Sequence, residues 1–165
     1  MTEAHSKPRF GLPVGVVVGL GLLAAPRVVL HDLDLINEGT LINALLVFVP
    51  LLIWIGVAVW RSTNPFVSLL AAGGVYGVCL LVVHNVLWSQ SWAGDPPRLG
   101  GNLEGRLPTA VEELFLRGAM SVTSLFTGLA VGTVCGAVAW AIARARSRYR
   151  GRFHPSRGHD SPDPR

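Results

Sequence analysis

The sequence predicts an all-α fold: a polytopic membrane protein folded as a four-helix transmembrane bundle, with both termini in the cytoplasm (N-in/C-in). Half of the 165 residues are apolar and only 15% are charged, whereas a soluble domain carries roughly a quarter charged residues. The mean hydropathy is also positive, at +0.46. Four long apolar stretches separated by polar segments account for this composition.

Each apolar stretch is long enough to cross a bilayer, which takes about 20 helical residues. We expect a cytoplasmic flank over residues 1–11 and a transmembrane domain over residues 12–146. The four spans are expected at about residues 12–30, 41–60, 66–88 and 114–142. In the second span, Pro50 lacks the N–H that the helix needs, so a kink is predicted there. We expect the first span to stay uncleaved, because Leu23 and Pro26 do not fit a signal-peptide cleavage site after Ala25.

The distribution of basic residues predicts the orientation, since Lys and Arg are retained on the cytoplasmic side. The connection between the first two spans has no Lys or Arg and carries Asp32, Asp34 and Glu38, so it is expected outside. The stretch after the fourth span carries the arginines Arg144, Arg146, Arg148, Arg150, Arg152, Arg157 and Arg165. We therefore expect a plasma-membrane protein whose basic C-terminal flank contacts anionic inner-leaflet lipids. Residues 147–165 are expected to form a disordered basic cytoplasmic tail.

The ratio of arginine to lysine indicates the source of the sequence. Lys7 is the single lysine among 14 basic residues. This bias is typical of a GC-rich bacterial genome, so the membrane is expected to be a bacterial inner membrane.

Small residues spaced four apart predict where the helices pack, because they let backbones approach closely in a membrane. They occur in the first, third and fourth spans, as Gly15 and Gly19, as Gly73 and Gly77, and as Ser124, Gly128, Gly132 and Gly136. The sequence leaves open whether the longest of these ladders packs within one bundle or between two copies of the chain.

Polar residues gather at one depth, near the expected outer ends of the spans. This candidate cluster consists of Arg27, His31, Asn43, His84, Asn85, Glu113, Arg117 and Ser121. His84 lies seven residues beyond Gly77 and shares its helix face, so its ring is expected to point into the bundle. Glu113 and Arg117 are four apart and are expected to pair. The tryptophans Trp60, Trp88 and Trp92 fit an interfacial aromatic belt.

Two interpretations of the polar cluster remain open. In the first, it forms an outward-facing pocket whose arginines hold an anionic headgroup or a carboxylate. In the second, it is an interhelical hydrogen-bond network in which Arg27 pairs with Asp32, Asp34 or Glu113. The first is functional and the second structural.

The sequence carries no motif with metal or redox specificity. Neither an HExxH nor a paired CxxC motif is present, and Cys79 and Cys135 both fall near the middle of spans. We therefore expect no metal and no cofactor, and no aromatic or structural motif predicts nucleic-acid binding.

Three functions follow in order of preference. The first is a non-enzymatic interaction or accessory protein, or a bundle that binds a small ligand or lipid, with a homo-oligomer or a membrane protein as partner. The alternative is an oligomeric transport-related protein in which Pro50 permits helix movement. The third is an outward-facing enzyme that uses His84 or His31 with Glu112 or Glu113 as acid and base.

Overall fold

The structure, a computed structural model, describes residues 10–92, 95 and 97–152. These residues form helices and no strand. In chain order the elements are α1 (Val14–Leu23), α2 (Ala25–Asp32), α3 (Leu41–Arg61), α4 (Pro65–Val86), α5 (Trp88–Ser91), the 3-10 turn η1 (Gly101–Leu103) and α6 (Thr109–Arg152). Residues 1–9 of the expected N-terminal flank and residues 153–165 of the expected tail lie outside the described part.

Four helical segments are long and apolar enough to cross a membrane. They are α1 with α2 (Val14–Asp32), α3, α4 and the stretch Thr109–Tyr149 of α6. Local sequence sets their starts: the Thr40 side chain accepts the Asn43 N–H at the start of α3, and the Asn64 side chain does the same for Val67 at α4. One expectation is wrong here, because residues 147–152 continue α6 instead of forming a disordered tail.

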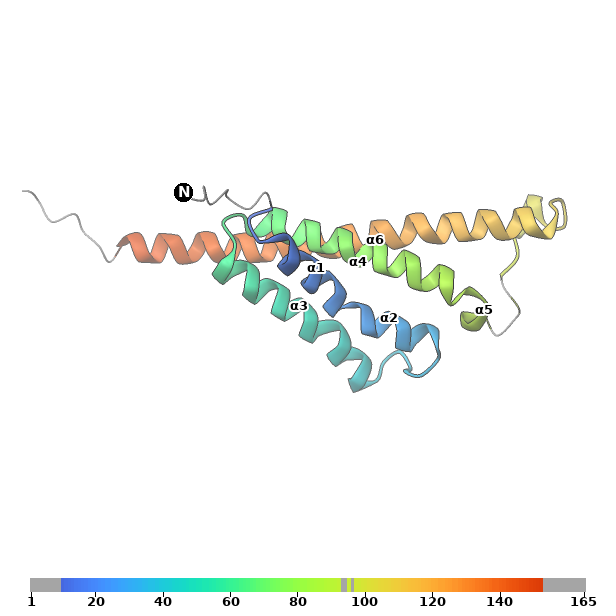
Figure 1. Cartoon of the computed structure of the whole chain (residues 1–165), viewed down its shortest axis with the longest axis horizontal. Helices are drawn as coiled ribbons and strands as arrows, with labels where there is room; N and C mark the ends of the chain where they lie inside the picture. Colours follow the sequence, from blue (N-terminus) through green and yellow to red (C-terminus); the bar gives the residue numbers. More distant parts are fainter. Residues whose placement is uncertain (1–9, 93–94, 96, 153–165) are drawn as a thin grey trace, which may run out of the picture.

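The four segments run in alternating directions, and α6 is much the longest (Figure 1). Helix α1 begins and α6 finishes at the same end of the bundle, as an even number of spans requires (Figure 1). We call this the Arg61 end, because it also carries the α3–α4 turn over residues 62–64. The opposite end, which carries the α2–α3 connection over residues 33–40, is called the Asp32 end.

The glycines of α4 and α6 form the tightest contact between helices. A Cβ atom built on Gly73 would meet the Gly128 carbonyl oxygen and would lie 2.7 Å from Gly132 Cα. A Cβ atom on Gly77 would lie 3.2 Å from the Ser124 carbonyl oxygen. Only the absence of side chains allows these backbones to approach so closely. The longest small-residue ladder therefore packs within one chain.

The glycines of α1 do not pack as the spacing predicted. Gly15 and Gly19 are exposed, and a Cβ atom on either would meet nothing within 4 Å. Instead, Gly21 makes the close approach to α4, where a Cβ atom would lie 2.9 Å from the Ala72 carbonyl oxygen. The spacing of four identified small residues correctly but selected the wrong face of this helix.

A break between α1 and α2 is stabilised by a buried tryptophan. The Ala24 N–H bonds the Gly21 carbonyl rather than the Leu20 carbonyl, which leaves the latter without its helical donor. Trp54 of α3 is fully buried and donates its indole N–H to this Leu20 oxygen at 2.7 Å. Pro50, also buried, lies within a continuous α3, so the predicted kink stays a prediction.

The outward faces of the helices carry large apolar side chains. Phe48 is 62% exposed and Leu52 66% exposed on α3, and Phe126 is 73% exposed on α6. Many large apolar side chains exposed on the outward faces are expected where a protein contacts a membrane or another protein. The described helices are accordingly compatible with a membrane protein.

Candidate functional site

The predicted polar residues all lie at the Asp32 end, where they divide into three groups. The first, which we call the Asp32 cluster, comprises His31, Asp32, Glu38, His84 and Ser124. The second, the Arg117 cluster, comprises Asn85, Glu113, Arg117 and Ser121. The third is the pair of Arg27 and Asn43.

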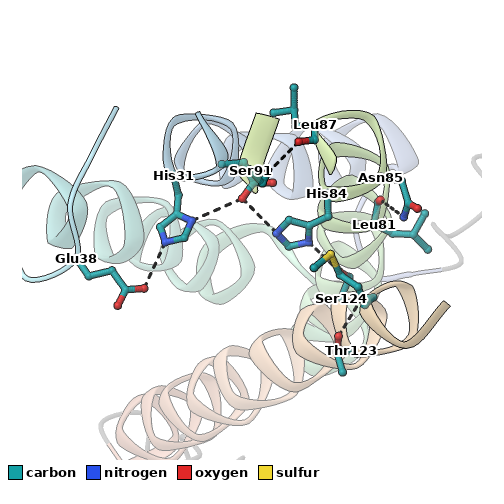
Figure 2. Close-up of polar contacts among 11 residues, drawn as sticks. His31, Glu38, Leu81, His84, Asn85, Leu87, Ser91, Thr123 and Ser124 are labelled. Carbon is teal, nitrogen blue, oxygen red and sulfur yellow. Dashed lines mark hydrogen bonds and ion pairs between the residues drawn. The ribbon is translucent and has the colours of Figure 1, made fainter. Parts of the chain in front are cut away.

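In the Asp32 cluster, two histidines share one carboxylate oxygen. Asp32 Oδ1 lies 3.6 Å from His31 Nδ1 and 3.5 Å from His84 Nε2. Figure 2 shows the two rings turned toward one another from different helices. The far side of the His31 ring approaches Glu38 at 3.3 Å, and His84 Nδ1 lies 3.1 Å from Ser124 Oγ (Figure 2). The cluster therefore joins α2, α4, α6 and the α2–α3 connection through polar contacts.

Asp32 is the last residue of α2 and comes directly before a sharp turn. Helix α2 continues to Asp32, and the chain then turns sharply through Asp34, whose φ of 55° lies in the left-handed region. The Leu35 N–H closes this turn on the Leu30 carbonyl at 2.9 Å. Two acidic residues thus end a helix, although the negative end of the helix dipole disfavours them there.

A recess of about 630 Å³ opens beside Asp32. The connection after α2 supplies most of its wall, and the rest comes from the end of α2, with His31 and Asp32, and from α5, with Gln90 and Ser91. Three carboxylates line it, from Asp32, Asp34 and Glu38, against one imidazole from His31. Its lining is therefore acidic, and it contains no arginine.

One oxygen of Asp32 has no partner. The Asp32 side chain is 5% exposed, and its Oδ2 atom is buried without a hydrogen bond to any described residue. Both imidazoles approach the other oxygen, Oδ1. Leaving a buried acceptor unpaired costs about 1–3 kcal/mol, and more when the group is charged.

The order Ser124, His84, Asp32 is that of a serine hydrolase triad, but the geometry does not provide a nucleophile. Ser124 is 4% exposed and lies where α6 packs against Gly77. It lines neither the recess beside Asp32 nor the smaller one beside Trp88. A nucleophile must reach the substrate and face groups that stabilise the oxyanion. Ser124 instead serves as a hydrogen-bond partner between α4 and α6.

In the Arg117 cluster, one guanidinium contacts three neighbours. Arg117 Nη2 lies 2.7 Å from Glu113 Oε1, and Nη1 donates to the Asn85 carbonyl at 3.3 Å. The same guanidinium lies 5.1 Å from the centre of the Trp88 ring, within the range of a cation–π contact. Asn85 in turn donates to Ser121 Oγ at 3.0 Å.

Trp88 is buried rather than interfacial. It is 3% exposed, and its indole N–H has no partner among the described residues. A second recess, of about 190 Å³, lies beside it and is lined also by Asp95, Arg98 and Glu113. The expectation that Trp88 belongs to an aromatic belt is therefore wrong.

Arg27 does not make the ion pair that the structural interpretation expected. Its Nε donates to Asn43 Oδ1 at 3.1 Å, which links the first segment to α3. The pairing of Arg27 with Asp32, Asp34 or Glu113 is therefore wrong. Since Arg117 is paired and Arg27 lies outside the acidic recess, the arginines do not form the anion-binding pocket of the functional interpretation.

The predicted acid–base pair of the enzyme hypothesis is also not formed. Glu113 pairs with Arg117, and Glu112 accepts the Leu99 N–H. The histidines contact Asp32, Glu38 and Ser124 instead. Nor are any three His, Cys, Asp or Glu residues in the described part of the chain arranged to hold a metal ion.

Sequence reasoning missed the central role of Asp32 and gave Ser124 only a packing role. Asp32 was assigned to a solvated acidic loop, whereas α2 continues to it and places it on the same helix face as the buried Val28, four residues earlier. Comparison of the chain with protein-family models, with curated proteins and with solved structures finds no match, so the function rests on the geometry of the site.

Proposed function

We propose that this protein is a small, non-enzymatic integral membrane protein that binds a small ligand at the Asp32 end of its four-helix bundle. The single observation that supports this function is the buried, half-satisfied carboxylate of Asp32 beside an open recess. Buried polar groups without partners are rare in native folds, and each one calls for an explanation such as a bound water or ion.

The proposed orientation places both termini in the cytoplasm and the recess outside. The basic residues Arg144, Arg146 and Arg148 then follow the apolar part of α6 on the inner side. Each basic residue near an anionic membrane surface contributes about 1 kcal/mol. The partners proposed for the basic C-terminal part of α6 are therefore anionic inner-leaflet lipids.

The orientation is tested by labelling intact cells with a membrane-impermeant maleimide. Glu38 is 78% exposed in its side chain, so Glu38→Cys in a chain without Cys79 and Cys135 is expected to be labelled from outside. Tags on the two termini are expected to react only after permeabilisation. A terminal tag that reacts in intact cells contradicts the orientation.

Ligand binding is tested with the full-length protein in lipid nanodiscs. Small cations, anions and neutral polar compounds are screened for the ability to raise the unfolding temperature. A ligand present at a hundred times its dissociation constant stabilises the folded state by about 2.7 kcal/mol. We expect one chemical class to do so, and Asp32→Asn to abolish the shift. The matched control is Glu104→Gln, which removes an exposed carboxylate that lines neither recess.

A further inference from the structure

We infer that Arg27 binds the phosphate group of a phospholipid headgroup through its Nη1 and Nη2 nitrogens. This inference rests on the proposed integral membrane protein, and it adds a site between α2 and α3 that is separate from both recesses. It follows from an arginine inside a candidate span that has a hydrogen-bond partner but no opposite charge beside it.

Arg27 carries a positive charge that its described neighbours do not balance. It lies within the candidate span Val14–Asp32, five residues before the end of that span. Its Nε donates to the uncharged Asn43 at 3.1 Å, and it forms no ion pair with any residue that the structure describes. Arg117, by contrast, pairs with Glu113 at 2.7 Å. An arginine in a span without a carboxylate partner indicates a site for another anion.

The bond to Asn43 leaves one edge of the guanidinium open. An arginine has five N–H donors in a planar fork, and Asn43 accepts the one on Nε. Among the described residues, the buried polar side-chain atoms without a partner are Asp32 Oδ2 and Trp88 Nε1. Nη1 and Nη2 of Arg27 also lack a partner there, but they are not among these buried atoms, so they have accessible surface. The edge that they form can donate two parallel hydrogen bonds to a phosphate.

The Arg27–Asn43 pair lies near the end of the apolar part of the bundle. Asn43 is two residues into α3, about 3 Å along the axis from the first residue of this helix. Figure 1 shows α2 and the start of α3 side by side at the edge of the bundle. Headgroups lie directly outside the hydrocarbon core, and long arginine side chains reach toward them. The guanidinium is therefore at a level that a headgroup phosphate can reach.

The surface one turn further into the bundle is apolar, which favours a phosphate carried on acyl chains over a free phosphate. Leu23 lies four residues before Arg27 and is 40% exposed. Val47 lies four residues after Asn43 and is partly exposed. Since the first segment and α3 run in opposite directions, both side chains lie on the bilayer side of the pair (Figure 1). The acyl chains of a bound phospholipid would contact them, whereas inorganic phosphate would not.

The lipid arm of the test uses native mass spectrometry of the full-length protein with equal amounts of phosphatidylglycerol and phosphatidylcholine. Both lipids carry a phosphate, but the choline group neutralises it in phosphatidylcholine. We expect preferential retention of phosphatidylglycerol, and we expect the affinity for one bound molecule to fall about tenfold or more in Arg27→Gln. Glutamine keeps an N–H donor for Asn43 and removes the charge. Arg27→Lys keeps the charge without the fork and is expected to lower the affinity about two- to fivefold.

Two control variants make this comparison specific. Arg106→Gln removes the same charge from an exposed position that lines neither recess, and it is expected to leave the retention of phosphatidylglycerol unchanged. Arg144→Gln reports on the lipids proposed for the C-terminal part of α6. Its effect on lipid retention is expected to add to that of Arg27→Gln, because the two sites are independent.

The solution arm distinguishes a lipid headgroup from free phosphate. Phosphatidylcholine nanodiscs that contain the full-length protein are titrated with inorganic phosphate by calorimetry. We expect no binding, because inorganic phosphate brings no acyl chain to the apolar surface beside Arg27. Binding of inorganic phosphate that is lost in Arg27→Gln overturns the phospholipid as the source of the phosphate.

The outcomes separate this inference from the proposed function. Equal losses of phosphatidylglycerol in Arg27→Gln and Arg106→Gln overturn the inference, because net charge alone then explains retention. A loss confined to Arg144→Gln also overturns it and leaves the lipids of the proposed function. Ligand binding in the Asp32 recess is measured separately and does not depend on Arg27. If Arg27→Gln does not fold, unchanged affinity in Arg27→Lys overturns the role assigned to Nη1 and Nη2.

Discussion

Replacing Gly73 with alanine tests the closest helix contact in the bundle, which lies between α4 and α6. The new Cβ atom would meet the Gly128 carbonyl oxygen and would lie 2.7 Å from Gly132 Cα. Both neighbours are backbone, so the two helices must move apart. Overpacking of this kind costs about 1–3 kcal/mol of the free energy of unfolding.

Gly74, the next residue on the same helix, is the matched control. A Cβ atom there would lie 3.9 Å from its nearest neighbour, Leu129 Cδ2, which is an ordinary contact. Alanine is better than glycine inside a helix by about 0.5–1 kcal/mol, and both variants gain this amount. Gly74→Ala is therefore expected to stabilise the protein, and Gly73→Ala to fall about 1–3 kcal/mol below it.

The comparison is made by unfolding the purified protein reversibly in mixed micelles of a mild detergent and dodecyl sulfate. Far-ultraviolet circular dichroism and tryptophan fluorescence report the transition. Because the two substitutions share their helix and their propensity gain, the difference between them measures packing alone. Equal stability of the two variants would refute the argument that the α4–α6 backbones are in contact at Gly73.

Two further contacts can be tested in the same unfolding assay. Trp54→Phe leaves the Leu20 carbonyl without its donor and is expected to cost about 1–3 kcal/mol, whereas Trp60→Phe, at a side chain that is 75% exposed, should stay within about 0.5 kcal/mol of the parent. A double-mutant cycle of His84→Leu and Ser124→Ala is expected to give a coupling energy of about 0.5–1.5 kcal/mol. Additive effects of the latter two substitutions would mean that the side chains do not interact.

The four candidate spans could be predicted because the length of each apolar stretch can be counted in the sequence. The starts of α3 and α4 were also predictable, since Thr40 and Asn64–Pro65 are local signals that need no tertiary contact. The face that a helix presents to its neighbour could not be predicted in this way. For α1, the break at Ala24 and the packing of Gly21 on α4 depend on other helices.

The level of the polar residues along the bundle could be predicted from the sequence, but their contact partners could not. Helical rise places His84 and Arg117 at a common level, because each residue adds about 1.5 Å along the axis. Which of their neighbours they contact depends on how each helix is rotated in the bundle. Asp32 was missed for a related reason: its burial depends on α2 continuing to the end of the segment, where the sequence suggests an exposed loop.

The C-terminal part of α6 extends beyond the apolar part of that helix. Ten residues of the helix follow position 142, and they extend it by about 15 Å. The headgroup layer on one side of a bilayer is only roughly 5–7 Å deep. In the proposed orientation, an upright α6 holds Arg144 near the phosphates and lifts Arg148 above them. The last turn of α6 then stands beyond the lipid headgroups on the cytoplasmic side of the membrane.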